Sequence, residues 1–176
     1  MKAIEQYNKV LERDPLNASV HNNLGLIYLS IANYPEAIKV LRQALLIDSR
    51  YDKAHNNLGT ALMRSGQDSE ATREFSKALE LNPKNAEAMT NLAILAKKSG
   101  NIDQAKFQYL RALQVNPSNP ETHYNLAILY EEQGEFGQAI EHFKKFLDSG
   151  SSAYPGYVRD VEKKIEELSN KKKGLE

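Results

Sequence analysis

The chain has 176 residues, which suits one compact domain or one array of small repeated units. Its 23 Lys and Arg balance its 23 Asp and Glu, so the broad positive field that drives non-specific binding to nucleic acid or anionic membranes is missing. Because cysteine is absent, disulfides, thiolate metal sites and cysteine catalysis are excluded. No apolar run approaches the ~20 residues of a membrane span. We therefore expect a cytoplasmic protein that binds no nucleic acid and does not insert into a membrane.

The sequence repeats itself at a period of 34 residues. Four blocks align without a gap and cover 136 of the 176 residues, at 18–51, 52–85, 86–119 and 120–153. A period of this size is typical of solenoids, in which each unit buries its apolar face against its neighbours. The fold is therefore expected to be an array of repeats.

Residues 1–17 match only the second half of a block. They predict a single helix whose apolar face, formed by Ile4, Tyr7, Val10 and Leu11, has no preceding helix to cover it. Two outcomes follow from this expectation. Either a longer natural protein supplies the missing helix, which we favour, or the chain forms a homo-oligomer through this half-repeat.

Each block predicts two amphipathic helices, because its apolar residues recur at intervals of three and four. Between the two helices of a block lies a glycine that suits a left-handed helix cap, at Gly66, Gly100 and Gly134. After the second helix lies a proline that blocks its continuation, at Pro15, Pro83 and Pro117. Small residues that let the paired helices approach recur as Gly25, Gly59, Ala93 and Ala127 on the first helix, and as Ala37, Ala71, Ala105 and Ala139 on the second. A third small position is interrupted by Phe146, so we expect different packing after it.

After the last block, residues 154–169 predict a capping helix with one apolar stripe and an otherwise polar surface. The stripe consists of Tyr157, Val161, Ile165 and Leu168. Residues 170–176 are expected to form a disordered tail.

This pattern resembles the tetratricopeptide repeat (TPR) family. The second block carries the family's motif as His55, Leu58-Gly59, Leu62, Ala71, Phe75, Ala78 and Pro83. The resemblance implies an all-α fold, a right-handed α-solenoid of stacked antiparallel helix pairs. We expect nine helices, and the capping helix as a tenth if it docks on the array. The resemblance also implies a concave groove lined by the first helix of each repeat, where members of such families bind partners.

The first helices carry a candidate peptide-binding face. Asn23, Asn57, Asn91 and Asn125 recur at one repeat position, and a primary amide can pair with both groups of a peptide bond. This ladder is similar to that of the substrate-recruiting repeats of O-linked N-acetylglucosamine transferases. The alternative is a family consensus residue bonded to water or to an adjacent helix. The full candidate set is Asn22, Asn23, Asn56, Asn57, Asn91, Asn125, Leu26, Thr60, Arg64, Ile94, Lys97, Lys98, Tyr124 and Ile128.

The charges on this face predict which peptides it accepts. Lys53, Arg64, Lys97 and Lys98 favour a partner with acidic residues over the middle of the face, unless they are only solvated surface charges. The family's clamp for a free C-terminal carboxylate is not expected, because its basic positions hold other residue types here.

The remaining polar residues indicate no chemistry. His21, His55 and His123 share one repeat position on separate helices, so we expect a packing role and no metal site. No nucleophile with an adjacent base and no phosphate-binding loop is present, so we expect no catalysis and no cofactor. The sequence thus predicts a protein–protein interaction module that binds a peptide in its groove. The alternatives are a self-assembling scaffold unit and a substrate-recruiting fragment of a larger enzyme.

Overall fold

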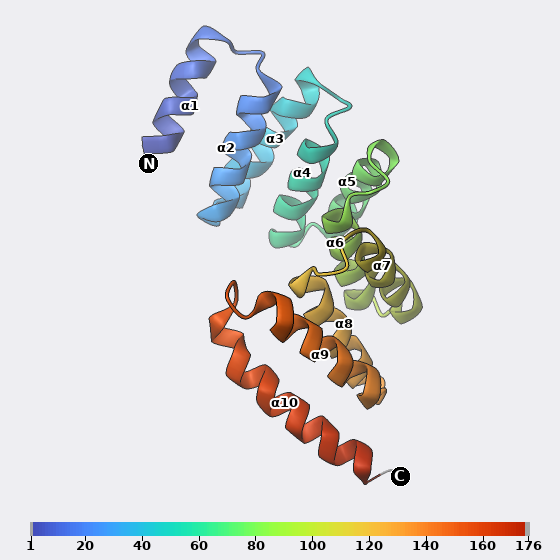
Figure 1. The fold of residues 1–176 in the computed structure, drawn as a ribbon. Helices are drawn as coiled ribbons and strands as arrows, with labels where there is room; N and C mark the ends of the chain where they lie inside the picture. The colour runs from blue at the N-terminus through green and yellow to red at the C-terminus, as the bar shows by residue number, and fades with distance from the viewer. Residues whose placement is uncertain (1, 175–176) are drawn as a thin grey trace. The chain divides into compact units, whose positions relative to one another are not determined.

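The computed structural model describes residues 2–174, and these form ten α-helices and no strand (Figure 1). The all-α prediction is therefore confirmed, including the tenth helix. The chain divides into two compact units between Leu95 and Ala96, and each unit is described by itself below. None of the ten described helices combines the length and apolar character that a membrane span requires.

The first unit contains two complete helix pairs. Its helices are α1 (Lys2–Arg13), α2 (Ala18–Ser30), α3 (Tyr34–Ile47), α4 (Asp52–Arg64), α5 (Asp68–Leu81) and most of α6 (Ala86–Lys98). Helix α2 packs on α3 and α4 packs on α5, while α3 also contacts α4 (Figure 1). Helices α3, α4, α5 and α6 supply the buried core, which includes Leu41, Leu58, Leu62 and Phe75, and α2 packs partly buried side chains against it.

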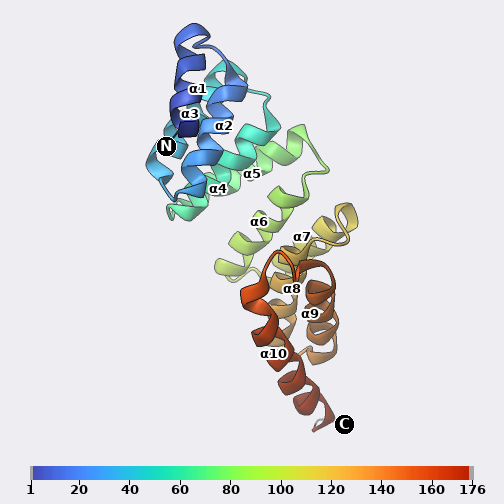
Figure 2. The same ribbon diagram turned by 60° about the vertical axis from the view of Figure 1, so that its left-hand side comes forward.

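The second unit contains α7 (Ile102–Val115), α8 (Pro120–Glu132), α9 (Phe136–Gly150) and α10 (Pro155–Lys173). Helix α9 packs on α8 and on α10, while α7 contacts α8 (Figure 2). Helix α10 runs to Lys173, so residues 170–173, which we expected in the disordered tail, are helical. Lys residues in the last turn favour this extension, since they oppose the negative end of the helix dipole. Residues 175–176 of the expected tail lie outside the described part of the chain.

The turn between paired helices has the same backbone conformation in every repeat. Gly66, Gly100 and Gly134 have φ angles of 82°, 82° and 75°, in the left-handed region that glycine adopts without a steric cost. In the first repeat the same position holds Ala32, with φ 56°. Sequence inspection missed this residue, because an alanine gives no sign that its backbone is left-handed.

Small residues allow the paired helices to approach closely. A Cβ atom placed on Gly59 of α4 would lie 2.7 Å from the ring of Phe75 on α5, closer than real contacts allow. Ala37, Ala71 and Ala105 on the second helices are fully buried. The small positions Gly25 and Gly59 are therefore points of contact within the α2–α3 and α4–α5 pairs.

Phe146 changes the packing at the end of the array. Its buried ring lies 5.3 Å from that of Tyr124 and 6.0 Å from that of Tyr154, measured between centroids. The cap α10 docks beside this cluster and buries Val161 and Leu168 from its apolar stripe. Tyr157, a member of the expected stripe, remains 52% exposed in the first turn of α10, where it meets the rings of Tyr124 and Tyr154 at nearly right angles to its own.

Helix α1 is the least covered helix of the first unit. It contacts α2, but none of its residues is buried, and Val10 is 43% exposed. Ile4, Tyr7 and Leu11 are half-buried. The apolar face of this helix is thus partly open to solvent.

Candidate functional site

The candidate face in the first unit begins with a pair of buried amides. Asn57 Nδ2 on α4 donates a hydrogen bond of 2.8 Å to Asn22 Oδ1 on α2. The two residues are only 8% and 3% exposed. This bond connects the first helices of neighbouring repeats, so the amide of Asn57 is engaged within the protein itself.

A second amide contact joins α6 to α4. Asn91 Nδ2 donates to Thr60 Oγ1 at 3.4 Å, and Thr60 Oγ1 in turn donates to the backbone oxygen of Asn56 at 3.0 Å. Asn91 and Asn56 are both buried. The side-chain oxygen of Asn56 has no hydrogen-bond partner among residues 2–174. Asn56 and Asn22 occupy equivalent repeat positions, but only Asn22 receives an amide donor from the next repeat.

The two outer members of the asparagine ladder behave differently. Asn23 on α2 and Asn125 on α8 are half-buried, and neither amide has a hydrogen-bond partner within its own unit in the described structure. One helical turn beyond Asn23, Leu26 is 45% exposed. The ladder therefore consists of two amides used between helices and two that remain available to a ligand.

The other candidate residues of the first unit lie on the same helix faces. Thr60 and Ile94 are half-buried, and Arg64 is exposed at the end of α4. Arg64 and Lys53, also on α4, have no carboxylate partner within residues 2–95. The first unit thus offers two uncompensated cations beside its buried amides.

In the second unit several candidate residues are already engaged. Tyr124 packs against Tyr157 of the cap at 5.6 Å and against Phe143 of α9 at 5.9 Å, while Ile128 is half-buried. Lys97 forms an ion pair of 2.8 Å with Glu132, and Lys98 also has a partner. The positive charge of Lys97 is therefore compensated within the protein.

The repeated histidines connect each first helix to the turn before it. His21 Nε2 lies 3.1 Å from the backbone oxygen of Pro15, and His55 Nε2 lies 3.1 Å from the backbone oxygen of Ser49. His123 Nε2 lies 2.9 Å from the backbone oxygen of Pro117. Since a carbonyl oxygen can only accept, each Nε2 carries the proton. The histidine position thus holds the helix start in place.

The other ring nitrogen faces the second helix of the same repeat. His55 Nδ1 lies 2.6 Å from a carboxylate oxygen of Glu74, whereas His123 Nδ1 lies 2.9 Å from His142 Nδ1. Burial, and after it the neighbouring His123, lower the pKa of His142 to about 4. Burial also lowers the pKa of His123. The same repeat position therefore faces a carboxylate in one repeat and a second histidine in another.

Family models match most of the repeats. A model described as the middle TPR-like domain of cilia and flagella-associated protein 70 matches residues 30–147, and a model of the TPR repeat matches residues 2–31. No curated protein sequence matches the chain.

Solved structures share the fold. MamA is 27% identical, with a TM-score of 0.69 over 88% of this chain and 84% of that one. The pilF protein of Pseudomonas aeruginosa is 23% identical, with a TM-score of 0.76 over 98% of this chain and 84% of that one. YrrB, described as a TPR protein with an unusual peptide-binding site, is 20% identical, with a TM-score of 0.70 over 96% of this chain and 91% of that one.

Proposed function

The chain belongs to the tetratricopeptide repeat family, and we propose that it is a protein-interaction module that binds a peptide segment of a partner on the faces of its first helices. The observation that carries the proposal is on α2, where the free amide of Asn23 lies one turn from the exposed Leu26. Proteins of this family are typically non-catalytic interaction modules. YrrB, which has the same fold, is described as having a peptide-binding site.

Asn23 and Leu26 offer two complementary kinds of contact. The amide presents both donor and acceptor groups to a peptide backbone, while the exposed leucine accepts an apolar side chain of the same segment. Because the two residues are three apart in a helix, their side chains lie on one face. A peptide that passes along α2 can use both at once.

The buried amides have a supporting role in this proposal. The bond from Asn57 to Asn22 fixes the spacing between α2 and α4, so the groups that meet the ligand are held in place before it binds. Asn91 acts in the same way through Thr60. Within the ladder we therefore assign ligand contacts to Asn23 and Asn125, and alignment of the helices to Asn57 and Asn91.

The uncompensated cations indicate the charge of the peptide. Lys53 and Arg64 lie at the two ends of α4 and favour a segment with acidic residues beside its apolar one. Such exposed charges act mainly on association rate and specificity. The salt dependence of binding should report on them.

The test starts from peptides selected on the whole chain from a random 12-residue display library. The affinity of each selected peptide is then measured by calorimetry for the wild type, for Asn23→Ala/Leu26→Ser and for the control Leu46→Ser. Leu46 is 77% exposed on the second helix α3, so its change removes a surface leucine away from the proposed face. We expect at least tenfold weaker binding for the double variant and unchanged binding for the control. Equal affinities for all three proteins would refute the proposal.

A further inference from the structure

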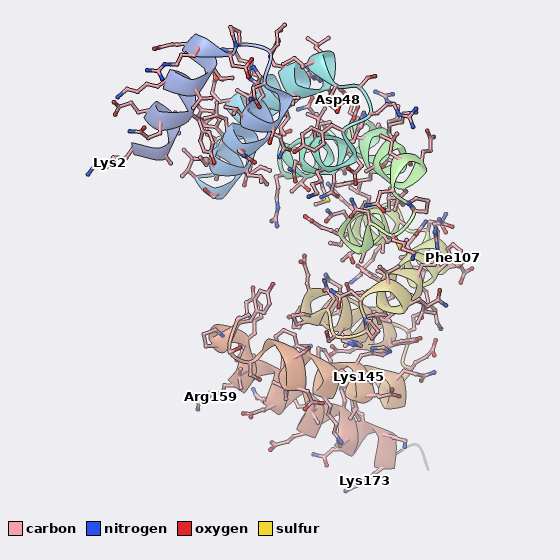
Figure 3. All side chains as sticks on the ribbon, turned by 45° about the horizontal axis from the view of Figure 1, so that its top comes forward. Lys2, Asp48, Phe107, Lys145, Arg159 and Lys173 are labelled. Atoms are coloured by element: carbon pink, nitrogen blue, oxygen red, sulfur yellow. The ribbon has the colours of Figure 1, made fainter. Side chains whose placement is uncertain are left out.

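Helix α7 exposes two large apolar side chains at repeat positions that are polar or charged in the other blocks. Its Phe107 and Leu110 are 55% and 40% exposed, and Val115 at the end of the helix is 40% exposed. Phe107 projects away from the helices around it (Figure 3). The positions equivalent to Phe107 and Leu110 hold polar or charged residues in the other repeats, namely Lys39 and Arg42, Arg73 and Ser76, and Glu141 and Lys144.

Because the other repeats carry polar or charged residues at these positions, the exposed apolar side chains of α7 indicate a binding surface. Scattered apolar residues are normal on any surface, whereas three exposed on one helix, two of them at positions that are polar or charged in the other blocks, form a patch. From Phe107 to Val115 the patch spans about two helical turns, roughly 12 Å at 1.5 Å per residue. That length fits the interacting face of a short helix.

A pocket of about 460 Å³ adjoins the patch within the second unit. Leu110 and Leu113 of α7 form one wall, and Pro117 and Lys145 contribute from the following turn and from α9. The buried pair of His123 and His142 also lines it. The pocket is large enough for a branched apolar side chain and lies beside the exposed leucine of the patch.

Two basic side chains contact this surface, one at the pocket and one at the ring of Phe107. Lys145 is the charged side chain that lines the pocket in the described structure, and it is paired with Glu141 at 2.6 Å. The guanidinium of Arg111 lies over the ring of Phe107, 5.7 Å from its centroid, and has no carboxylate partner within residues 96–174. A ligand with a carboxylate next to its apolar side chains would pair with Arg111.

We propose that the outer surface of α7 and the adjoining pocket bind an amphipathic helix of a protein partner, with leucine-type side chains in the pocket and an acidic residue beside Arg111. A helix offers apolar anchors at intervals of three and four residues, which matches the spacing of Phe107 and Leu110. This surface lies on a second helix, so it is separate from the peptide face proposed on the first helices.

The test uses a designed 15-residue helical peptide with leucines at positions 4, 7, 8 and 11 and glutamates along both flanks. Its twin carries lysine in place of every glutamate. Chemical shifts of the isotope-labelled chain are followed by NMR during titration. We expect the acidic peptide to shift the signals of Leu110, Leu113 and Arg111, and to bind at least tenfold more tightly than its twin.

The matched variant is Phe107→Arg/Leu110→Ser, which installs the residues of the second repeat at both positions. It should weaken binding at least tenfold without lowering the melting temperature, since both side chains are exposed. Leu26→Ser should bind the acidic peptide as the wild type does. Equal binding of the twin peptide, or full binding by the matched variant, would overturn the proposal. So would self-association of the wild type in sedimentation that the matched variant abolishes, because the surface would then belong to a second copy of the chain.

Discussion

The Nδ1 atoms of His123 and His142 lie 2.9 Å apart, between the paired helices α8 and α9. His123 carries a proton on Nε2, which faces the Pro117 carbonyl, so in the neutral pair His142 donates from Nδ1 and His123 accepts. The ring of Tyr130 stacks on His142 at 5.6 Å, and Lys145 and Glu141 are the nearby charged groups. The two Nδ1 atoms cannot both carry a proton without losing this bond.

We predict that acid weakens the fold through this pair. The pKa of His142 is lowered to about 4 in the folded chain, against 6.5 for an ordinary histidine, so the unfolded chain binds more protons between these values. The free energy of unfolding should therefore fall as pH drops from about 6.5 toward 4. At pH 5 we expect it to lie about 1–2 kcal/mol below its value at pH 7 in denaturant titrations, since residual solvent screens part of the effect.

The control is His142→Glu, which installs the residue found at the equivalent position of the second repeat, where Glu74 faces His55. A carboxylate favours a protonated His123, so this variant should lose less stability between pH 7 and pH 5 than the wild type. If both proteins show the same pH dependence, the histidine pair does not cause it.

A second prediction separates the two roles of the asparagine ladder. Asn57→Ala removes the donor to the buried Asn22 Oδ1 and should lower the free energy of unfolding by about 1–3 kcal/mol. Asn23→Ala removes an amide with no partner in its unit, so its effect should stay within about 0.5 kcal/mol. Chemical denaturation measures both. A double-mutant cycle of Asn57→Ala with Asn22→Ala should show a coupling above about 0.5 kcal/mol, and additive effects would contradict the bond.

The sequence could predict the helices and the turns, because periodicity and small residues depend on local rules that repeat every 34 residues. It could not predict which amides of the ladder are engaged. Asn57 and its partner Asn22 are 35 residues apart, one more than the repeat, because neighbouring first helices meet at non-equivalent positions. Aligning the repeats compares equivalent positions only and hides such a contact. The adjacent pairs Asn22-Asn23 and Asn56-Asn57 were the available signal.

A third prediction concerns the left-handed turn of the first repeat. Ala32 adopts φ 56° where the other repeats place glycine, a conformation that costs an alanine roughly 1–2 kcal/mol. Ala32→Gly relieves this cost but makes the unfolded chain more flexible, so we expect a net gain of about 0.5–1 kcal/mol in the free energy of unfolding. The reverse change, Gly66→Ala, should destabilise by a similar amount. A loss of melting temperature for Ala32→Gly would contradict the prediction.

The last prediction concerns the partly open apolar face of α1. Ile4 and Leu11 are half-buried and Val10 is 43% exposed, so another molecule that covers them removes apolar area from water. Burying apolar surface stabilises a contact by roughly 25 cal/mol per Å², so a few hundred Å² would favour association by several kcal/mol. The entropic cost of association offsets most of this gain, so the net interaction is weak. We therefore expect the chain to self-associate reversibly at high concentration in sedimentation experiments.

Ile4→Glu/Leu11→Glu should abolish this association, because the two carboxylates would have to be buried in the contact. Leu46→Glu is the matched control, since Leu46 is a more exposed leucine on another second helix, and its replacement should leave the association constant unchanged. Association that persists in the α1 variant but is lost with Leu46→Glu would place the contact on α3. A wild type that stays monomeric at millimolar concentration would show that α2 already covers enough of this face to keep α1 from binding a second copy.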